Sequence, residues 1–159
     1  MTGFGRILDD LNGAGIRYVL IGGIALIRHG VVRATRDVDA VFDPDPGNVE
    51  RIRALVEQWG ATRPDGSAIP KGGIAGDRTI HLSTPHGALD LLSEAAASVA
   101  FADLLTRAET RPVDGVDAPI CSLADLVAMK RSVGRERDLV DLADLEAAHG
   151  DLPDSRGTT

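Results

Sequence analysis

Two neighbouring segments decide the fold of this chain: VLIGGIALIRHG at residues 19–30 and RATRDVDAVF at residues 33–42. The apolar run at residues 17–21 is short and is followed by glycine, which indicates a buried strand. Gly22 and Gly23 let the backbone turn sharply and leave room for a bulky anion, because they carry no Cβ. If a helix begins at Ile24, its free N–H groups and positive dipole end favour a phosphate at this turn.

The second segment alternates carboxylates with apolar side chains. In a strand, Asp37 and Asp39 share one face with Cα atoms about 6.7 Å apart, while Val38, Ala40 and Phe42 face the core. Two carboxylates this close repel each other, and both stay ionised only beside a compensating cation. Magnesium suits the pair, because it takes oxygen ligands from carboxylates and from substrate phosphates together. A phosphate turn beside a magnesium-binding pair indicates nucleotide chemistry.

This order of residues resembles a known signature. Gly22-Gly23, a spacer of about a dozen residues and then the Asp-x-Asp pair are similar to the signature of the nucleotidyltransferase fold, the DNA polymerase beta superfamily. Residues 33–39 resemble its small bacterial members, including the AbiEii-type and MenT-type toxins. The resemblance spans roughly residues 18–145. It implies an α/β (α+β) fold, in which helices flank a mixed β-sheet and a small helical C-terminal region follows.

Hydrophobic periodicity places the other elements. Helices are expected at residues 4–11, 24–29, 46–59, 95–108, 123–133 and 139–145, and strands at 17–21, 37–42, 78–82 and 88–92, with a hairpin at 111–120. We expect residues 1–95 to form the catalytic core, 96–150 to form a helical region that completes the active site, and 151–159 to form a flexible tail. Between the elements, residues 61–76 form a glycine-rich loop. Lys71 there either reaches a phosphate from a lid or lies in a solvated linker.

Asp90 is a carboxylate inside an otherwise apolar predicted strand, where an unpaired charge is costly. In the resembled family a third acid comes from such a strand beside the first pair, so Asp90 is the candidate. It would ligate metal with Asp37 and Asp39, or take the proton from the attacking hydroxyl. The alternative is an edge position that faces water.

The resemblance also implies roles for residues outside the strands. In the resembled toxins a lysine on the first of two C-terminal helices and an aspartate just after the break complete the site, and Lys130 and Asp138 occupy those places. The Lys130 ammonium would stabilise charge on a triphosphate, and Asp138 would orient Lys130 or an arginine. Arg33 and Thr35 would bind the nucleotide together with Lys130 and the two glycines. The alternative for Lys130 and Asp138 is a charge pair on the surface.

Composition narrows the class of protein. A length of 159 residues suits one domain, and the hydrophobic share of 43% and charged share of 26% are typical of soluble globular proteins. Cys121 is the sole cysteine and no run reaches membrane-spanning length, so we expect a cytoplasmic protein without a membrane partner. The net charge of -7 weighs against broad nonspecific nucleic-acid binding, although local basic residues could still bind RNA. His81, His86 and Cys121 show no triad or zinc pattern and are assigned no chemistry.

We therefore predict a metal-dependent nucleotidyltransferase. An acceptor hydroxyl would attack the α-phosphate of a nucleoside triphosphate (NTP) such as ATP, and pyrophosphate would leave, with two Mg²⁺ ions, or Mn²⁺, at the three acids. The resemblance implies a toxin that modifies tRNA or another RNA and is neutralised by an antitoxin protein. The alternatives are transfer to an antibiotic-type small molecule or a protein, and a non-catalytic nucleotide-binding module. Basic residues around the site would favour RNA, whereas an acidic cleft would favour a cationic drug.

Overall fold

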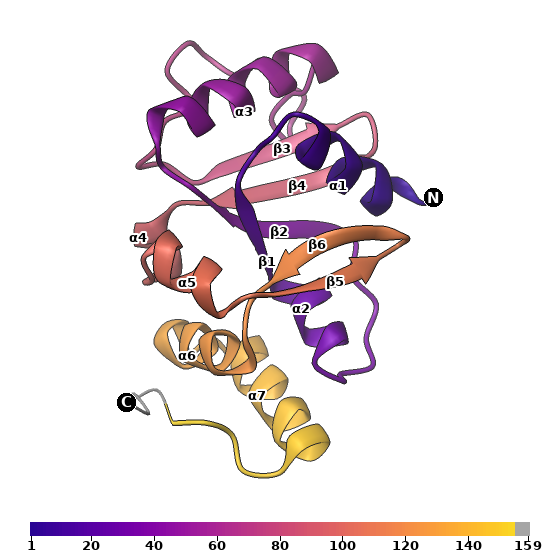
Figure 1. The fold of residues 1–159 in the computed structure, drawn as a ribbon, viewed down its shortest axis with the longest axis vertical. Helices are drawn as coiled ribbons and strands as arrows, with labels where there is room; N and C mark the ends of the chain where they lie inside the picture. Colours follow the sequence, from indigo (N-terminus) through magenta and orange to yellow (C-terminus); the bar gives the residue numbers. More distant parts are fainter. Residues whose placement is uncertain (155–159) are drawn as a thin grey trace.

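A mixed six-stranded sheet forms the centre of the molecule (Figure 1). The computed structural model describes residues 1–154. The strand order is β3-β4-β2-β1-β6-β5. The strands are β1 (Tyr18–Ile21), β2 (Asp37–Phe42), β3 (Ile80–Thr84), β4 (Gly87–Leu92), β5 (Glu109–Val113) and β6 (Val116–Ile120). Pairs β2–β4 and β1–β6 are parallel and the other three pairs are antiparallel, so the expected mixed sheet is confirmed.

The described residues also form seven helices. They are α1 (Gly3–Gly13), α2 (Gly22–Arg28), α3 (Pro46–Trp59), α4 (Glu94–Ala97), α5 (Phe101–Arg107), α6 (Leu123–Val133) and α7 (Glu136–His149). Figure 1 shows α3 at one end of the molecule and the α6–α7 pair at the other. Residues 96–150 also supply β5 and β6, which extend the sheet beside β1. Of the expected tail, residues 151–154 form no helix or strand and residues 155–159 lie outside the described part.

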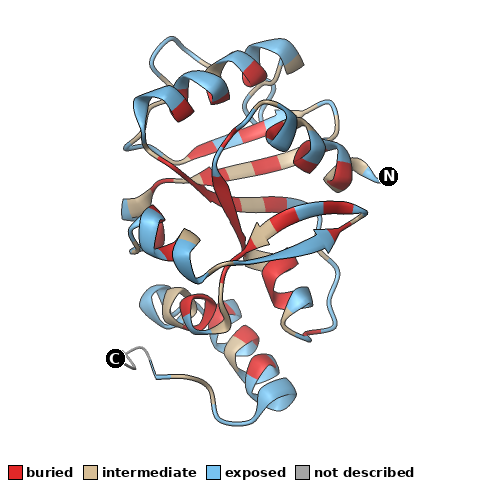
Figure 2. Ribbon diagram, in the orientation of Figure 1, coloured by how far each residue is buried: buried red, intermediate tan, exposed pale blue. Residues whose placement is uncertain are grey.

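The central strands hold the core together. All four residues of β1 are buried, as the red colour of this strand in Figure 2 shows. Val19 and Leu20 are 0% exposed, because β1 lies between strands β2 and β6. In β2 the side chains of Val38, Ala40 and Phe42 are also buried, which confirms that they face the core. Burying one such apolar side chain contributes about 1.5–3 kcal/mol. This packing fixes the register of β2 and thereby the position of its carboxylates.

Local sequence signals set several helix ends as expected. Pro46 lies in the first turn of α3, and the Asp45 carboxylate caps it by accepting from the Gly47 N–H at 3.0 Å. Gly60 ends α3 with φ 61°. Ser122 caps α6 by accepting from the Asp125 N–H at 3.1 Å. These ends are predictable because each depends on residues only a few positions apart.

Two expected helices differ from the structure. The helix predicted at residues 95–108 is wrong as one element: it is interrupted after α4, where Ser98 takes a left-handed φ of 56°. The Glu94 carboxylate then accepts from the Phe101 N–H at 2.6 Å, which sets the start of α5. The helix expected from Ile24 begins two residues earlier, so that Gly22 and Gly23 form its first turn. Periodicity misses both features because neither changes the apolar pattern.

Candidate active site

The predicted site residues line a single cavity. This site cavity has a volume of about 580 Å³ and lies against β1, α2, β2, β3, β4, α4, α6 and α7. Every residue to which the sequence assigned a catalytic or binding role lines it: Gly22, Gly23, Arg33, Thr35, Asp37, Asp39, Asp90, Lys130 and Asp138. These residues come from segments more than a hundred positions apart, and the sheet order and the α6–α7 pair bring them together.

The carboxylates meet where β2 and β4 pair. The parallel register places Asp39 opposite Asp90, while Asp37 lies opposite Ala88 at the exposed end of β2. Burial raises the pKa of the Asp39 carboxyl to about 6, and the neighbouring charge and hydrogen bond of Asp90 contribute to this rise. At neutral pH the ionised pair is therefore unfavourable in the protein alone. A bound cation would offset this cost.

The donor chemistry fits a hard divalent cation. Asp39 and Asp90 offer carboxylate oxygens, with Asp37 beside them on the same strand as Asp39, and oxygen donors suit Mg²⁺ and Mn²⁺. Within residues 1–154 no three His, Cys, Asp or Glu side chains are arranged as a formed metal site. The fit to a metal thus rests on the Asp39–Asp90 pair and on the high pKa of Asp39.

The two glycines serve a purpose that the sequence did not indicate. A Cβ at Gly22 would lie 2.3 Å from Asp39 Oδ2, and a Cβ at Gly23 would lie 2.5 Å from Thr35 Oγ1. Gly22 also has φ +64°, which disfavours a side chain. Asp39 and Thr35 therefore occupy part of the space beside the glycines that we expected for a substrate anion. The glycines let the start of α2 approach the carboxylates closely.

The start of α2 remains available to an anion. Its N-cap residue, Ile21, forms no side-chain cap hydrogen bond, so protein side chains do not satisfy the first-turn N–H groups through the cap. These N–H groups belong to the same turn as Gly22 and Gly23, which line the site cavity. A phosphate in the cavity could accept from them.

A charge network around two buried carboxylates, Asp138 and Asp141, also lines the site cavity. Lys130 Nζ lies 2.8 Å from Asp141 and 3.3 Å from Asp138, whose side chain is only 1% exposed. Arg135 binds Asp138 at 2.9 Å, and Arg33 binds Asp141 at 2.5 Å. Burial raises the pKa of Asp138, but hydrogen bonds from Arg135 and the charge of Lys130 outweigh it and leave the pKa below its usual value. The alternative of a surface charge pair is therefore wrong.

Two residues of this site were not assigned from the sequence. His81 Nδ1 lies 2.8 Å from Asp90 Oδ1, because the β3–β4 hairpin pairs these two positions directly. Asp141 follows Asp138 by three residues, which places both carboxylates on one face of α7. Hairpin pairing and helical spacing were the signals that could have identified them.

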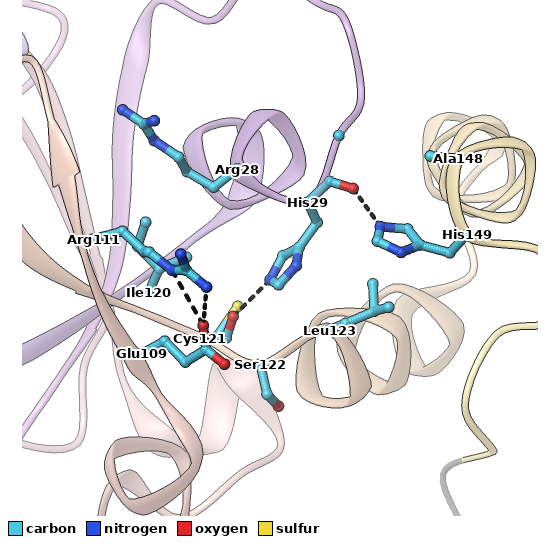
Figure 3. A pocket seen from close by; sticks show the side chains of 11 residues that line it. Arg28, His29, Glu109, Arg111, Ile120, Cys121, Ser122, Leu123, Ala148 and His149 are labelled. Carbon is cyan, nitrogen blue, oxygen red and sulfur yellow. Dashed lines mark hydrogen bonds and ion pairs between the residues drawn. The ribbon is translucent and has the colours of Figure 1, made fainter.

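A larger pocket lies away from the carboxylates. It has a volume of about 720 Å³ and lies beside the ends of α2 and α7 (Figure 3). Figure 3 shows that its polar groups mostly bind one another: His29 Nε2 donates to the Cys121 carbonyl oxygen at 2.8 Å, and Arg111 pairs with Glu109. The His149 ring contacts the His29 carbonyl oxygen. His29 thus makes contacts within the protein, and the site cavity is the better candidate for chemistry.

Comparison with protein families places the chain among nucleotidyltransferases. The family model described as "Nucleotidyltransferase of unknown function (DUF6036)" matches residues 7–149. No curated protein sequence is significantly similar to the chain.

No helix within residues 1–154 is long and apolar enough to cross a membrane.

Solved structures share the fold at low sequence identity. The lincosamide antibiotic adenylyltransferase LnuA, bound to lincomycin, has a TM-score of 0.63 and 15% identity over 92% of this chain and 96% of its own. The antibiotic-resistance factor ANT(2'')-Ia has a TM-score of 0.61 and 13% identity over 93% and 83%. An antigenic nucleotidyltransferase-like protein from Paracoccidioides brasiliensis has a TM-score of 0.60 and 18% identity over 91% and 72%. At these identities the likeness shows a common fold and leaves the acceptor open.

Proposed function

Because the chain belongs to the DUF6036 family of nucleotidyltransferases, we propose that it transfers a nucleoside monophosphate from an NTP to an acceptor hydroxyl. The observation that carries this proposal is the Asp39–Asp90 pair, which faces the start of α2 within the site cavity. A bound cation would stabilise a pair of carboxylates in which one pKa is raised, and the adjacent N–H groups suit the phosphates that the cation would accompany. In this proposal the metal ion would bind at the carboxylates, and the triphosphate would bind at the start of α2 in the same cavity.

The chain's cationic and backbone donors would bind the triphosphate. The first-turn N–H groups at Gly22 and Gly23 would bind the β- and γ-phosphates, with Arg33 and Thr35 beside them. Lys130 would stabilise negative charge as it develops on the leaving pyrophosphate. Its position is fixed by Asp138 and Asp141, so the lysine is already oriented before the nucleotide binds. In this proposal residues 1–95 supply the acids and residues 96–150 complete the site.

The acids would prepare the attacking hydroxyl. Asp37, Asp39 and Asp90 would hold divalent metal, which stabilises the attacking and leaving oxygens when bound. Asp90 is also the candidate base, because the acceptor proton needs a carboxylate close to the attacking oxygen. His81 Nδ1 lies 2.8 Å from Asp90 Oδ1 and would help to orient this carboxylate. The contact with His81 of β3 would therefore orient Asp90 toward the proton of the acceptor hydroxyl.

We propose RNA, including tRNA, as the acceptor. Arg36 and Arg137 line the site cavity and form no ion pair within residues 1–154, so they are available to phosphates. Neutralisation of backbone phosphates by such cations is the main source of affinity for nucleic acids. A toxin neutralised by an antitoxin is the cellular role that would follow from transfer to RNA. Growth arrest on expression, relieved by a protein encoded beside it, would test that role.

The proposed activity is tested with α-labelled NTPs. The protein is incubated with each NTP, Mg²⁺ or Mn²⁺, and separated fractions of cellular RNA, protein and small molecules. We expect label in the RNA fraction, and none with the Asp39→Asn variant or with a metal chelator. Label in the small-molecule fraction would support an antibiotic-type enzyme instead. Metal-dependent NTP binding without transfer to any fraction would contradict the enzyme proposal and favour a binding module.

A further inference from the structure

The site cavity has two ends that lie over different strands. At one end, Gly22 and Gly23 follow β1, and at the other end Thr79 and His81 lie just before and within β3. In the strand order these ends are separated by β2 and β4. If the triphosphate lies at the α2 end, the space beside Asp90 and β3 is left for the acceptor.

A second hollow continues from the β3 end. It has a volume of about 300 Å³ and shares Thr79 and His81 with the site cavity. Three cations line it, namely Arg63, Lys71 and Arg78, and no carboxylate does. We call these three residues and the space between them the basic hollow. In a chain with a net charge of -7, such a local excess of positive charge is a distinct feature.

The cations of the basic hollow are not engaged elsewhere in the protein. None of the three forms an ion pair with any residue from 1 to 154. The carboxylate of Asp65, two residues after Arg63, accepts instead from the Ser67 N–H and hydroxyl at 2.9 and 2.6 Å. The three positive charges are therefore available to a negatively charged partner.

The segment that carries these cations is held against the protein. Thr62 exchanges two backbone hydrogen bonds with Ser83 of β3, at 3.1 and 2.8 Å. Further along, the Arg53 guanidinium of α3 donates to the Ile74 carbonyl oxygen at 3.0 and 2.6 Å. The chain between these anchors forms turns closed by backbone hydrogen bonds, such as the Gly73 N–H to the Pro70 carbonyl oxygen at 2.9 Å. The cations thus sit on a supported surface and not on a free linker.

We propose that the basic hollow binds phosphodiester groups of the acceptor RNA, next to the nucleotide whose hydroxyl attacks. The inference rests on the proposed function for the position of the reacting hydroxyl, beside Asp90. It deepens that function by naming the acceptor as a polyanion with at least one phosphate adjacent to the reacting nucleotide. A cationic drug would be repelled from three unpaired positive charges.

Binding of RNA tests this inference without requiring turnover. A short fluorescent single-stranded RNA is titrated with the full chain in Mg²⁺, and its anisotropy is measured at several salt concentrations. The test variant is Lys71→Gln/Arg78→Gln. The matched control is Arg6→Gln/Arg51→Gln, which removes the same charge from exposed residues of α1 and α3. All four residues are exposed, so melting curves should show that both variants stay folded.

We expect the test variant to weaken RNA binding at least tenfold. The slope of log affinity against log salt should fall by about 0.7 for each RNA phosphate that the variant no longer neutralises. The control should change affinity less than twofold. Where transfer is active, the KM for RNA should rise while the KM for NTP and kcat stay within twofold. Equal RNA affinity in the test and control variants would overturn the proposal. So would displacement of the RNA by millimolar nucleoside monophosphate alone, which would indicate a small phosphorylated acceptor.

The basic hollow and the proposed enzymatic function can each fail without the other. Loss of RNA binding in the test variant, with no nucleotidyl transfer by the wild type, would support the basic hollow and refute the enzyme. Transfer to RNA with the same RNA KM in both variants would support the enzyme and refute the basic hollow.

Discussion

Substituting Asp39 by asparagine should make the metal-free protein more stable. The Asp39 carboxyl has a pKa of about 6 in the folded chain, against an ordinary value of 3.8, chiefly because it is buried and secondly because Asp90 lies opposite. Each pKa unit corresponds to about 1.4 kcal/mol, so a difference of about 2 units costs the folded state about 3 kcal/mol once the group is ionised. Asparagine has the same shape and no charge, so Asp39→Asn removes this cost.

The pH dependence of the effect has a definite sign. Between about pH 4 and pH 6 the folded protein holds a proton on Asp39 that the unfolded chain releases, so the stability of the wild type falls as pH rises through this window. Below about pH 4 both states are protonated and the difference between variant and wild type should vanish. Above about pH 6 the difference should reach its full size of about 3 kcal/mol.

Urea unfolding in a chelator at about pH 3 and about pH 8 measures the effect, on either side of that window. Asp77→Asn is the control, because Asp77 is exposed and forms no ion pair within the part of the chain that the structure describes. Adding Mg²⁺ should stabilise the wild type and not Asp39→Asn, since a ligand that binds only the folded state adds to its stability. If Asp39→Asn is no more stable than the wild type at the higher pH without metal, the reasoning is refuted.

Three further substitutions or treatments test the remaining contacts. Gly22→Ala should cost about 1–3 kcal/mol of stability and abolish transfer, because φ is +64° and the new Cβ would meet Asp39. The control Gly13→Ala, where no atom lies within 4 Å of the new Cβ, should change the melting temperature little. Asp138→Ala should cost about 1.5–3 kcal/mol, because it removes the buried carboxylate that binds Arg135 and one of the two carboxylates that bind Lys130. Glu50→Ala, at an exposed pair with Arg53, should cost under about 1 kcal/mol, and equal losses in urea unfolding would contradict the buried network. Burial raises the pKa of the Cys121 thiol to about 12, so a disulfide reagent at mildly alkaline pH should label this thiol only after the protein unfolds. Rapid labelling of the native protein would contradict this prediction.

The sequence predicts the centre of the fold because its signals there are local and mutually consistent. Alternation in residues 37–42 determines which side chains of β2 face the core, and the Asp45–Pro46 and Ser122 caps set two helix starts. The break at Ser98 is not predictable from periodicity, because it depends on a contact between Glu94 and Phe101 that forms only in the folded chain.

The candidate site is predictable in its residue types and less so in its contacts. The sequence indicates a close approach at Gly22 and Gly23, but the groups that approach them are Asp39 and Thr35, and no local pattern gives the register that brings them there. His81 shows no catalytic pattern in the sequence, because its importance comes from lying across a hairpin from Asp90. Asp141 gains its role only when α7 packs on α6 and brings it to Lys130.

The most direct test of nucleotidyl transfer follows two labels in one NTP. The protein is incubated with Mg²⁺, RNA and an NTP labelled at either the α- or the γ-phosphate, with Asp39→Asn as the inactive control. Transfer at the Asp39–Asp90 pair predicts that the α-label appears on the RNA and that an equal amount of γ-label appears as pyrophosphate, both absent with the control. Release of γ-label as inorganic phosphate, or its appearance on the RNA, would mean a hydrolase or a kinase and would contradict the account.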